Sequence, residues 1–199
     1  MLEVRGLACA HHERTLFSGV SFSLASGQWL HVRGENGAGK TSLLRVLVGL
    51  AHAEVGEVHW AGERVPSARF REDTLYHGHP AAVKEEQTPL ENLRTALAID
   101  DVPADDATIL RALGRLGLRG REELPVRVLS AGQKRRVLLA RLLLRPAKLW
   151  VLDEAFNALD TAAVTLLGAL IGEHLAVGGL AVLTSHQPLP LPGGEVLTL

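Results

Sequence analysis

The sequence lacks the features that mark secreted and membrane-spanning proteins. It has a single cysteine, Cys9, among 199 residues, which excludes an internal disulfide and a cysteine-rich metal site. No apolar run approaches the roughly 20 residues that cross a bilayer as a helix, and the first residues lack the charged and apolar regions of a signal peptide. Lys and Arg number 21 against 22 Asp and Glu, so the net charge of -1 gives no overall attraction to nucleic acid or anionic lipid. These absences predict a soluble cytoplasmic protein that reaches a membrane only through a protein partner.

What the sequence does contain is an alternation of apolar and amphipathic segments. Hydrophobic residues make up 47% of the chain, enough for one sizeable core. Apolar strands that alternate with helices predict an α/β fold with parallel strands. We expect a single domain, 1–199, in which a helical lobe at approximately 80–145 is inserted in the core. Strands are predicted at 2–7, 21–25, 29–34, 57–60, 74–78, 149–153 and 179–185, and helices at 41–50, 90–98, 105–117, 132–145 and 161–176.

The segment GENGAGKT, residues 34–41, has the spacing of a phosphate-binding loop between a strand and a helix. Its glycines allow backbone angles that side chains forbid, so successive N–H groups turn toward a phosphate at the positive end of the helix. Lys40 is expected to bridge the β- and γ-phosphates of ATP, and Thr41 to ligate Mg²⁺. The alternative is a glycine-rich turn with a surface lysine, which the flanking strand and helix argue against. The expected ATP-binding residues are Gly34, Glu35, Asn36, Gly37, Ala38, Gly39, Lys40, Thr41 and Ser42.

The segment LWVLDEA, residues 149–155, supplies the acidic partners of such a loop. Its apolar residues predict a buried strand, and Asp153 and Glu154 follow at the carboxyl end, where α/β folds bind ligands. Asp153 is expected to hold Mg²⁺ through its water shell. Glu154 is expected to polarise the attacking water as a general base. The alternative is a pair of acids that only caps a strand end.

The segment LSAGQ, residues 129–133, predicts a second anion site because it precedes another helix N-terminus. A phosphate-binding loop and a second anion site in one monomer are explained if two copies meet head-to-tail and complete each other's ATP site. The sequence therefore predicts a homodimer. The residues expected to reach ATP bound to the partner are Ser130, Ala131, Gly132 and Gln133.

These motifs, with ALD at 158–160 and His186, resemble in order and spacing the ATPase family of ABC transporters. The resemblance implies a P-loop NTPase fold: a RecA-like core sheet, an antiparallel β subdomain and a small helical lobe. It also implies that Asp160 organises the dimer interface and that His186 contacts the γ-phosphate and the attacking water. The family stacks an aromatic residue on adenine where this chain has His11. Ala155 replaces the usual proline after the catalytic glutamate.

A finer resemblance, to the ATP-binding subunit of the cytochrome c maturation or haem exporter system (CcmA type), is carried by ERTLFSGVSFSL at 13–24, LSAGQKRRVLLARL at 129–142 and SHQPL at 185–189. It implies a homodimer docked on an integral permease at the cytoplasmic face of the bacterial inner membrane. ATP hydrolysis there drives release of a haem-loaded chaperone. The alternatives are the ATPase of another small-substrate ABC transporter and a non-transport ABC ATPase on ribosomes or DNA. The basic run KRR at 134–136 is read as a solvated or paired face, so no direct nucleic-acid contact is expected.

One position departs from the family pattern where a glutamine normally touches Mg²⁺ or the water. Counting back from Glu91 places that glutamine at Pro80, within HGHPAAVK at 77–84. Our hypothesis is that His79 or a water takes over this role while the loop still docks on the membrane subunit. The alternative is that the missing glutamine has little consequence. A strong gain in Mg²⁺-dependent ATPase from Pro80→Gln in the assembled complex would count against His79.

Overall fold

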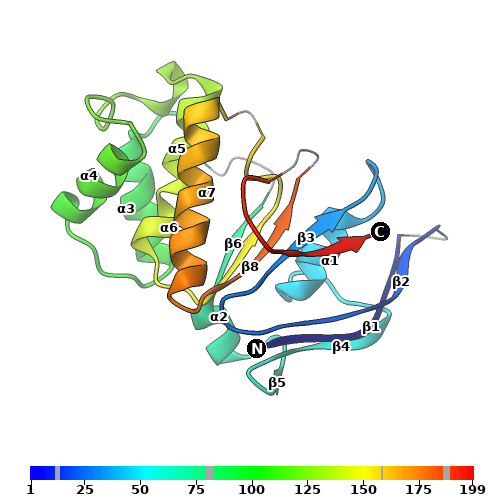
Figure 1. The fold of residues 1–199 in the computed structure, drawn as a ribbon. Coiled ribbons are helices and arrows are strands. Elements are labelled where there is room, and N and C mark those ends of the chain that lie inside the picture. Colours follow the sequence, from blue (N-terminus) through cyan, green and yellow to red (C-terminus); the bar gives the residue numbers. More distant parts are fainter. Residues whose placement is uncertain (12–13, 79–82, 158, 186–188) are drawn as a thin grey trace. The chain divides into compact units, whose positions relative to one another are not determined.

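The computed structural model describes residues 1–11, 14–78, 83–157, 159–185 and 189–199 (Figure 1). These residues form two compact units. The first contains Met1–His79, Ala147–Ala155 and Gly168–Leu199, and the second contains Pro80–Pro146 and Phe156–Leu167. Across the described ranges, no helix combines the length and apolar character needed to cross a membrane.

The first unit begins with an antiparallel sheet of order β2-β1-β4-β5. Its strands are β1 (Leu2–His11), β2 (Arg14–Leu24), β4 (Val55–Trp60) and β5 (Glu63–Arg64). Leu2, Val4 and Leu7 of β1 are buried while residues between them are more exposed, which is the pattern of a sheet covered on one face. The end of the β1–β2 hairpin, where His11 pairs with Arg14, belongs to the cavity described below.

The second sheet of this unit is parallel and has the order β6-β7-β8-β3-β9. Its strands are β6 (Thr74–His77), β7 (Leu149–Leu152), β8 (Leu180–Thr184), β3 (Trp29–Arg33) and β9 (Glu195–Thr198). β7 and β8 are buried along their whole length, as expected of strands covered on both faces. Since all five run the same way, the residues that follow β3, β7 and β8 leave the sheet at the same edge (Figure 1).

Helices complete the first unit. α1 (Lys40–Leu47) buries Leu43, Leu44 and Leu47, and α2 (Ala68–Asp73) is capped by Ser67, whose side chain accepts from the amide of Phe70. α7 (Thr161–Ala176) begins in the second unit and continues into the first at Gly168.

The second unit is helical in its described residues. It contains α3 (Pro89–Ile99), α4 (Asp106–Arg115), the 3₁₀ turn η1 (Val126–Val128), α5 (Ala131–Leu139) and α6 (Arg141–Leu144). The sequence predicted one helix over 132–145, and this was wrong in detail. The Ala140 amide shares its hydrogen between the carbonyls of Arg136 (3.1 Å) and Val137 (3.2 Å), and the Leu143 amide bonds back to Ala140. This tightening to shorter hydrogen-bonded turns separates α5 from α6.

The predicted fold class is confirmed, because the chain combines an antiparallel sheet with a parallel sheet of the P-loop type. β5, β9 and α2 were not predicted. The single-domain boundaries and the helical lobe at approximately 80–145 stay predictions.

Candidate functional site

The phosphate-binding loop connects β3 to α1 through glycines with positive φ. Gly34, Gly37 and Gly39 have φ values of 151°, 82° and 98°, a region that other residues enter at a cost. Gly39 is the N-cap of α1 and provides no side-chain acceptor for the first amides of the helix. These amides are therefore left without a side-chain cap, which suits binding of an anion.

Lys40 is buried at the start of α1, with only 7% of its surface exposed. Its ammonium donates hydrogen bonds to the carbonyls of Gly34 (2.7 Å) and Glu35 (2.9 Å), which holds the side chain across the loop. This placement keeps a buried positive charge beside the amides at the start of α1. The predicted roles of Lys40 and the other loop residues in binding phosphate remain predictions.

Asp153 follows β7 and is fully buried. Two hydroxyl groups donate to its carboxylate: Thr41 to Oδ2 at 2.8 Å and Thr184 to Oδ1 at 2.7 Å. The Thr41 hydroxyl and the Asp153 carboxylate are hard oxygen donors next to the phosphate loop, and Mg²⁺ prefers such ligands. The residues present thus fit the predicted Mg²⁺ site.

Glu154 comes next and adopts an unusual backbone conformation. Its φ is 51°, in the left-handed region, where a side chain costs roughly 1–2 kcal/mol. Its amide donates to the Thr184 hydroxyl at 2.8 Å, so one hydroxyl contacts both acidic residues. Glu154 lines the same cavity as the phosphate loop, and its role as a general base stays a prediction.

A cavity of about 360 Å³ joins the phosphate loop to the end of the β1–β2 hairpin. His11, the predicted neighbour of adenine, lines it. Arg14 and Leu16 line it too, and both were missed, because no motif marks them and only the hairpin brings them beside the loop. The lining residues are His11, Arg14, Leu16, Asn36, Gly37, Gly39, Lys40, Thr41, Ser42 and Glu154.

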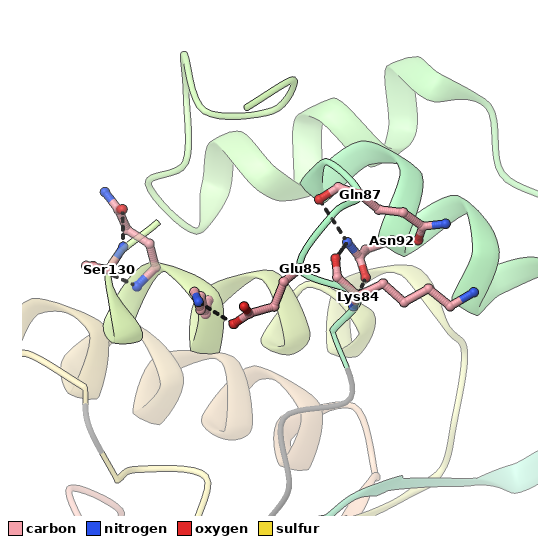
Figure 2. A network of polar contacts seen from close by, with 7 residues as sticks. Lys84, Glu85, Gln87, Asn92 and Ser130 are labelled. Atoms are coloured by element: carbon pink, nitrogen blue, oxygen red, sulfur yellow. Dashed lines mark hydrogen bonds and ion pairs between the residues drawn. The ribbon is translucent and has the colours of Figure 1, made fainter. Parts of the chain in front are cut away.

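The signature segment lies in the second unit at the start of α5 (Figure 2). Ser130 is the N-cap, and its hydroxyl accepts from the Gln133 amide at 3.2 Å. The Gln133 side chain accepts in return from the Ser130 amide at 3.0 Å, which completes a capping box. Ala131 and Gly132 form the first turn between them. The predicted contact of this segment with ATP of a partner stays a prediction.

A polar network fixes the segment that follows residues 79–82 onto the same unit (Figure 2). Asn92 on α3 donates to the carbonyls of Lys84 and Thr88, each at 3.0 Å, and accepts from the Lys84 amide at 2.8 Å. Glu85 forms an ion pair with Lys134 of α5 at 2.5 Å. This segment is therefore tied both to α3 and to the helix that carries the signature residues.

Asp160 precedes α7, and its carboxylate caps the start of that helix and pairs with a residue of the second unit. Its Oδ1 accepts from the Ala163 amide at 2.8 Å, and its Oδ2 pairs with Arg136 at 2.5 Å. The bond from Ala163, helped by the charge of Arg136, lowers the pKa of Asp160. The predicted positions at His186 and Pro80, and the proposed substitute His79, lie outside the described residues.

Comparisons with known proteins identify the family. The ABC transporter family model matches residues 17–157. The cytochrome c biogenesis ATP-binding export protein CcmA of Dechloromonas aromatica is 50% identical over 203 residues, which covers 100% of this chain and 98% of that protein.

Solved structures share the fold at lower identity. An ABC transporter ATP-binding protein from Pyrococcus furiosus has a TM-score of 0.87 and 23% identity, covering 100% of this chain and 96% of its own. A dimeric ATP-binding cassette, solved in a post-hydrolysis state with ADP and Pi, has a TM-score of 0.83 and 21% identity, covering 100% of this chain and 94% of its own. The ABC transporter family model matches residues 17–157, and the CcmA relative is 50% identical across the whole of this chain. This chain therefore belongs to the ABC transporter ATP-binding family and, within it, to the CcmA group of cytochrome c biogenesis ATP-binding export proteins.

Proposed function

We propose that this ABC-type ATPase is the ATP-hydrolysing subunit of a cytochrome c biogenesis export complex of the haem exporter type. The likeness to a CcmA protein over the whole chain supports this assignment. In this proposal, ATP hydrolysis drives release of a haem-loaded chaperone. The haem itself, in this proposal, is handled by other subunits.

The observation that carries the hydrolytic part is the cluster of Thr41, Asp153, Glu154 and Thr184 beside the phosphate loop. We propose that Lys40 and the α1 amides hold the β- and γ-phosphates, and that Thr41 and Asp153 hold Mg²⁺. When bound there, Mg²⁺ supplies positive charge that offsets the charge of the phosphates. Glu154 orients a water molecule and accepts its proton as the water oxygen bonds to the γ-phosphorus, while the bond from that phosphorus to the β,γ-bridging oxygen breaks and ADP leaves.

We further propose a homodimer with two composite ATP sites. Each chain carries a phosphate loop in the first unit and a signature segment in the second, and the ATP-binding cassette of the same fold was solved as a dimer. The signature residues would donate to the γ-phosphate held by the partner. Asp160 would lie at the dimer interface, His186 at the γ-phosphate and His11 at the adenine.

The proposed partners are integral membrane permease subunits, and the proposed location is the cytoplasmic face of the bacterial inner membrane. The word "export" in the name of the full-length relative supports a membrane partner. Contact with the bilayer would go through those subunits, and no nucleic acid takes part.

The test is purification of the tagged protein from detergent-solubilised membranes, with partners identified by mass spectrometry and a visible absorption spectrum recorded. Recovery of permease subunits with a haem Soret band is the expected result. A permease without haem would keep the transporter ATPase and remove the haem assignment. Recovery without any membrane subunit would overturn the proposal of an export complex.

A further inference from the structure

We propose that Thr184, at the carboxyl end of β8, is a positioning residue of the ATPase centre that fixes both acidic residues through one hydroxyl group. The inference rests on the proposed roles of Asp153 and Glu154. Thr184 belongs to none of the motifs that identify the family in the sequence.

The hydroxyl of Thr184 uses its donor and acceptor capacity at the same time. It donates to Asp153 Oδ1 at 2.7 Å and accepts from the Glu154 amide at 2.8 Å. Both Thr184 and Asp153 have 0% of their surface exposed, so solvent does not compete for these bonds. The other carboxylate oxygen, Oδ2, is bonded by Thr41. Thr184 therefore fixes the rotation of the carboxylate that faces the phosphate loop.

The second bond acts on a backbone that is strained. Glu154 has a φ of 51°, which a residue with a side chain adopts only when its surroundings enforce it. The bond to Thr184 is such a constraint, because it satisfies the Glu154 amide in this conformation. In this conformation Glu154 lines the cavity together with Lys40 and Ser42. Without the hydroxyl, the Glu154 amide loses this partner, and we expect the proposed base to shift away from its water.

Ser185, which follows Thr184, shows that the end of β8 is itself held in place by a hydrogen bond from β3. The Arg33 guanidinium donates to Nδ1 of His31 at 3.0 Å, so the imidazole carries its hydrogen on Nε2 and donates it to the Ser185 carbonyl at 3.2 Å. Burial is the main cause that lowers the pKa of His31, and the charge of Arg33 acts in the same direction, although the bond to Ser185 opposes them. The neutral imidazole links β8 to β3, the strand that leads into the phosphate loop.

The test compares Thr184→Val, which keeps the shape and removes the hydroxyl, with Thr184→Ser, which keeps the hydroxyl. Turnover is measured with saturating MgATP, and nucleotide affinity is measured with a fluorescent ATP analogue in Mg²⁺ and in EDTA. Thr184→Val is expected to lower kcat by roughly 10- to 100-fold, which corresponds to losing a hydrogen bond to a charged group. Its affinity in EDTA should stay within about twofold of the wild type, while the tightening caused by Mg²⁺ becomes smaller. Thr184→Ser should restore both properties.

Two controls separate the possible failures. Thr74→Val makes the same change at the amino end of β6, at the opposite edge of the parallel sheet, and should leave kcat unchanged. Glu154→Gln must lower kcat, and if it does not, the proposed role of Glu154 fails. If Glu154→Gln is slow but Thr184→Val turns over like Thr184→Ser with the same Mg²⁺ dependence, the role of Thr184 is refuted. A loss of affinity in EDTA together with a lower melting temperature would also refute it, because the residue would then be only structural.

Discussion

Two helix N-termini of this chain are predicted to face phosphate, and their ends are built in opposite ways. α1 begins after Gly39, which offers no side-chain acceptor to the first amides. α5 begins after Ser130, and its capping box with Gln133 satisfies the amides of both residues within the chain.

The difference shows how each end could meet an anion. At α1 the uncapped amides and Lys40 can donate hydrogen bonds to a phosphate, and no hydrogen bond within the helix has to break first. At α5 the capping box already satisfies the amides of Ser130 and Gln133. What it leaves for a phosphate is the first-turn amides of Ala131 and Gly132 and the hydrogen of the Ser130 hydroxyl, which accepts in the box and is still able to donate. We infer that α1 is a binding site by itself, while α5 only completes a site formed elsewhere.

The largest effect is expected from Glu154→Gln, which tests whether the two ends meet in a dimer. The change removes the proposed base and should lower kcat by roughly 10²- to 10⁴-fold while ATP still binds. ATP should then accumulate between two chains, and gel filtration with ATP should show a dimer. If the variant stayed a monomer in the presence of ATP, the proposed difference between the two helix ends would be refuted, because the N-terminus of α5 would then contact no ATP bound to a partner. Adding Lys40→Ala to the variant should abolish the dimer.

The next effect concerns the cap of α5. Ser130→Ala removes the acceptor in the capping box and should cost about 0.5–2 kcal/mol of unfolding free energy. It also removes the proposed donor to phosphate, so turnover should fall by about tenfold or more. Gln133→Ala breaks the reciprocal half of the box but keeps the Ser130 hydroxyl, so it should lower turnover less than Ser130→Ala does. Urea denaturation and ATPase assays would measure both, and equal turnover in the two variants would contradict a role for the Ser130 hydroxyl.

A smaller effect is expected from alanine at the uncapped end of α1. Gly39→Ala and Gly37→Ala both place a side chain at positive φ, which costs roughly 1–2 kcal/mol. At Gly39 the new methyl would also lie 3.0 Å from Leu16 Cβ, whereas at Gly37 no heavy atom of the described residues beyond its chain neighbours lies within 4 Å. Gly39→Ala should therefore weaken binding of ATP more than Gly37→Ala does, as a nucleotide titration would show. The reverse order would mean that backbone conformation alone, and not the contact with Leu16, limits this position.

The smallest effect involves a third helix end, where Asp160 caps α7 with a carboxylate. Its pKa is lowered from the usual 3.8, mainly by the Ala163 amide. The stabilising effect is therefore present above pH 3.8 and is lost as the pH falls through the lower pKa of the folded state. Asp160→Asn should reduce the acid dependence of the melting temperature slightly. Arg136→Gln, which removes only the ion pair, should preserve most of this acid dependence. If Arg136→Gln reduced the acid dependence as much as Asp160→Asn does, the lowered pKa of Asp160 would be due mainly to Arg136.

Much of the fold and of the phosphate loop could be predicted from the sequence, because their signals are local. The spacing of glycines before Lys40 fixes a turn between a strand and a helix, and apolar runs such as 149–152 indicate buried parallel strands. The fold class was predicted correctly on these grounds. Asp153 and Glu154 were placed at a strand end by the same local pattern.

Other features depend on contacts between distant segments. β9 has only four residues, and its pairing with β3 depends on the tertiary fold. The separation of α5 from α6 results from shared hydrogen bonds at Ala140, in a run whose apolar pattern is continuous. In the sequence, Thr184 cannot be distinguished from other residues of a buried strand. Its contacts with Asp153 and Glu154 depend on the pairing of β7 with β8.

The last strand has a practical consequence for handling the protein. The Leu199 amide donates to the Arg33 carbonyl at 3.0 Å, and a Cβ added at Gly34 would lie 3.0 Å from the Leu199 carbonyl. An affinity tag joined after Leu199 would thus begin in contact with the first residue of the phosphate loop, and we expect it to perturb nucleotide binding in the assays described above. Met1 is 55% exposed, so purification tags and labels for binding studies belong at that end.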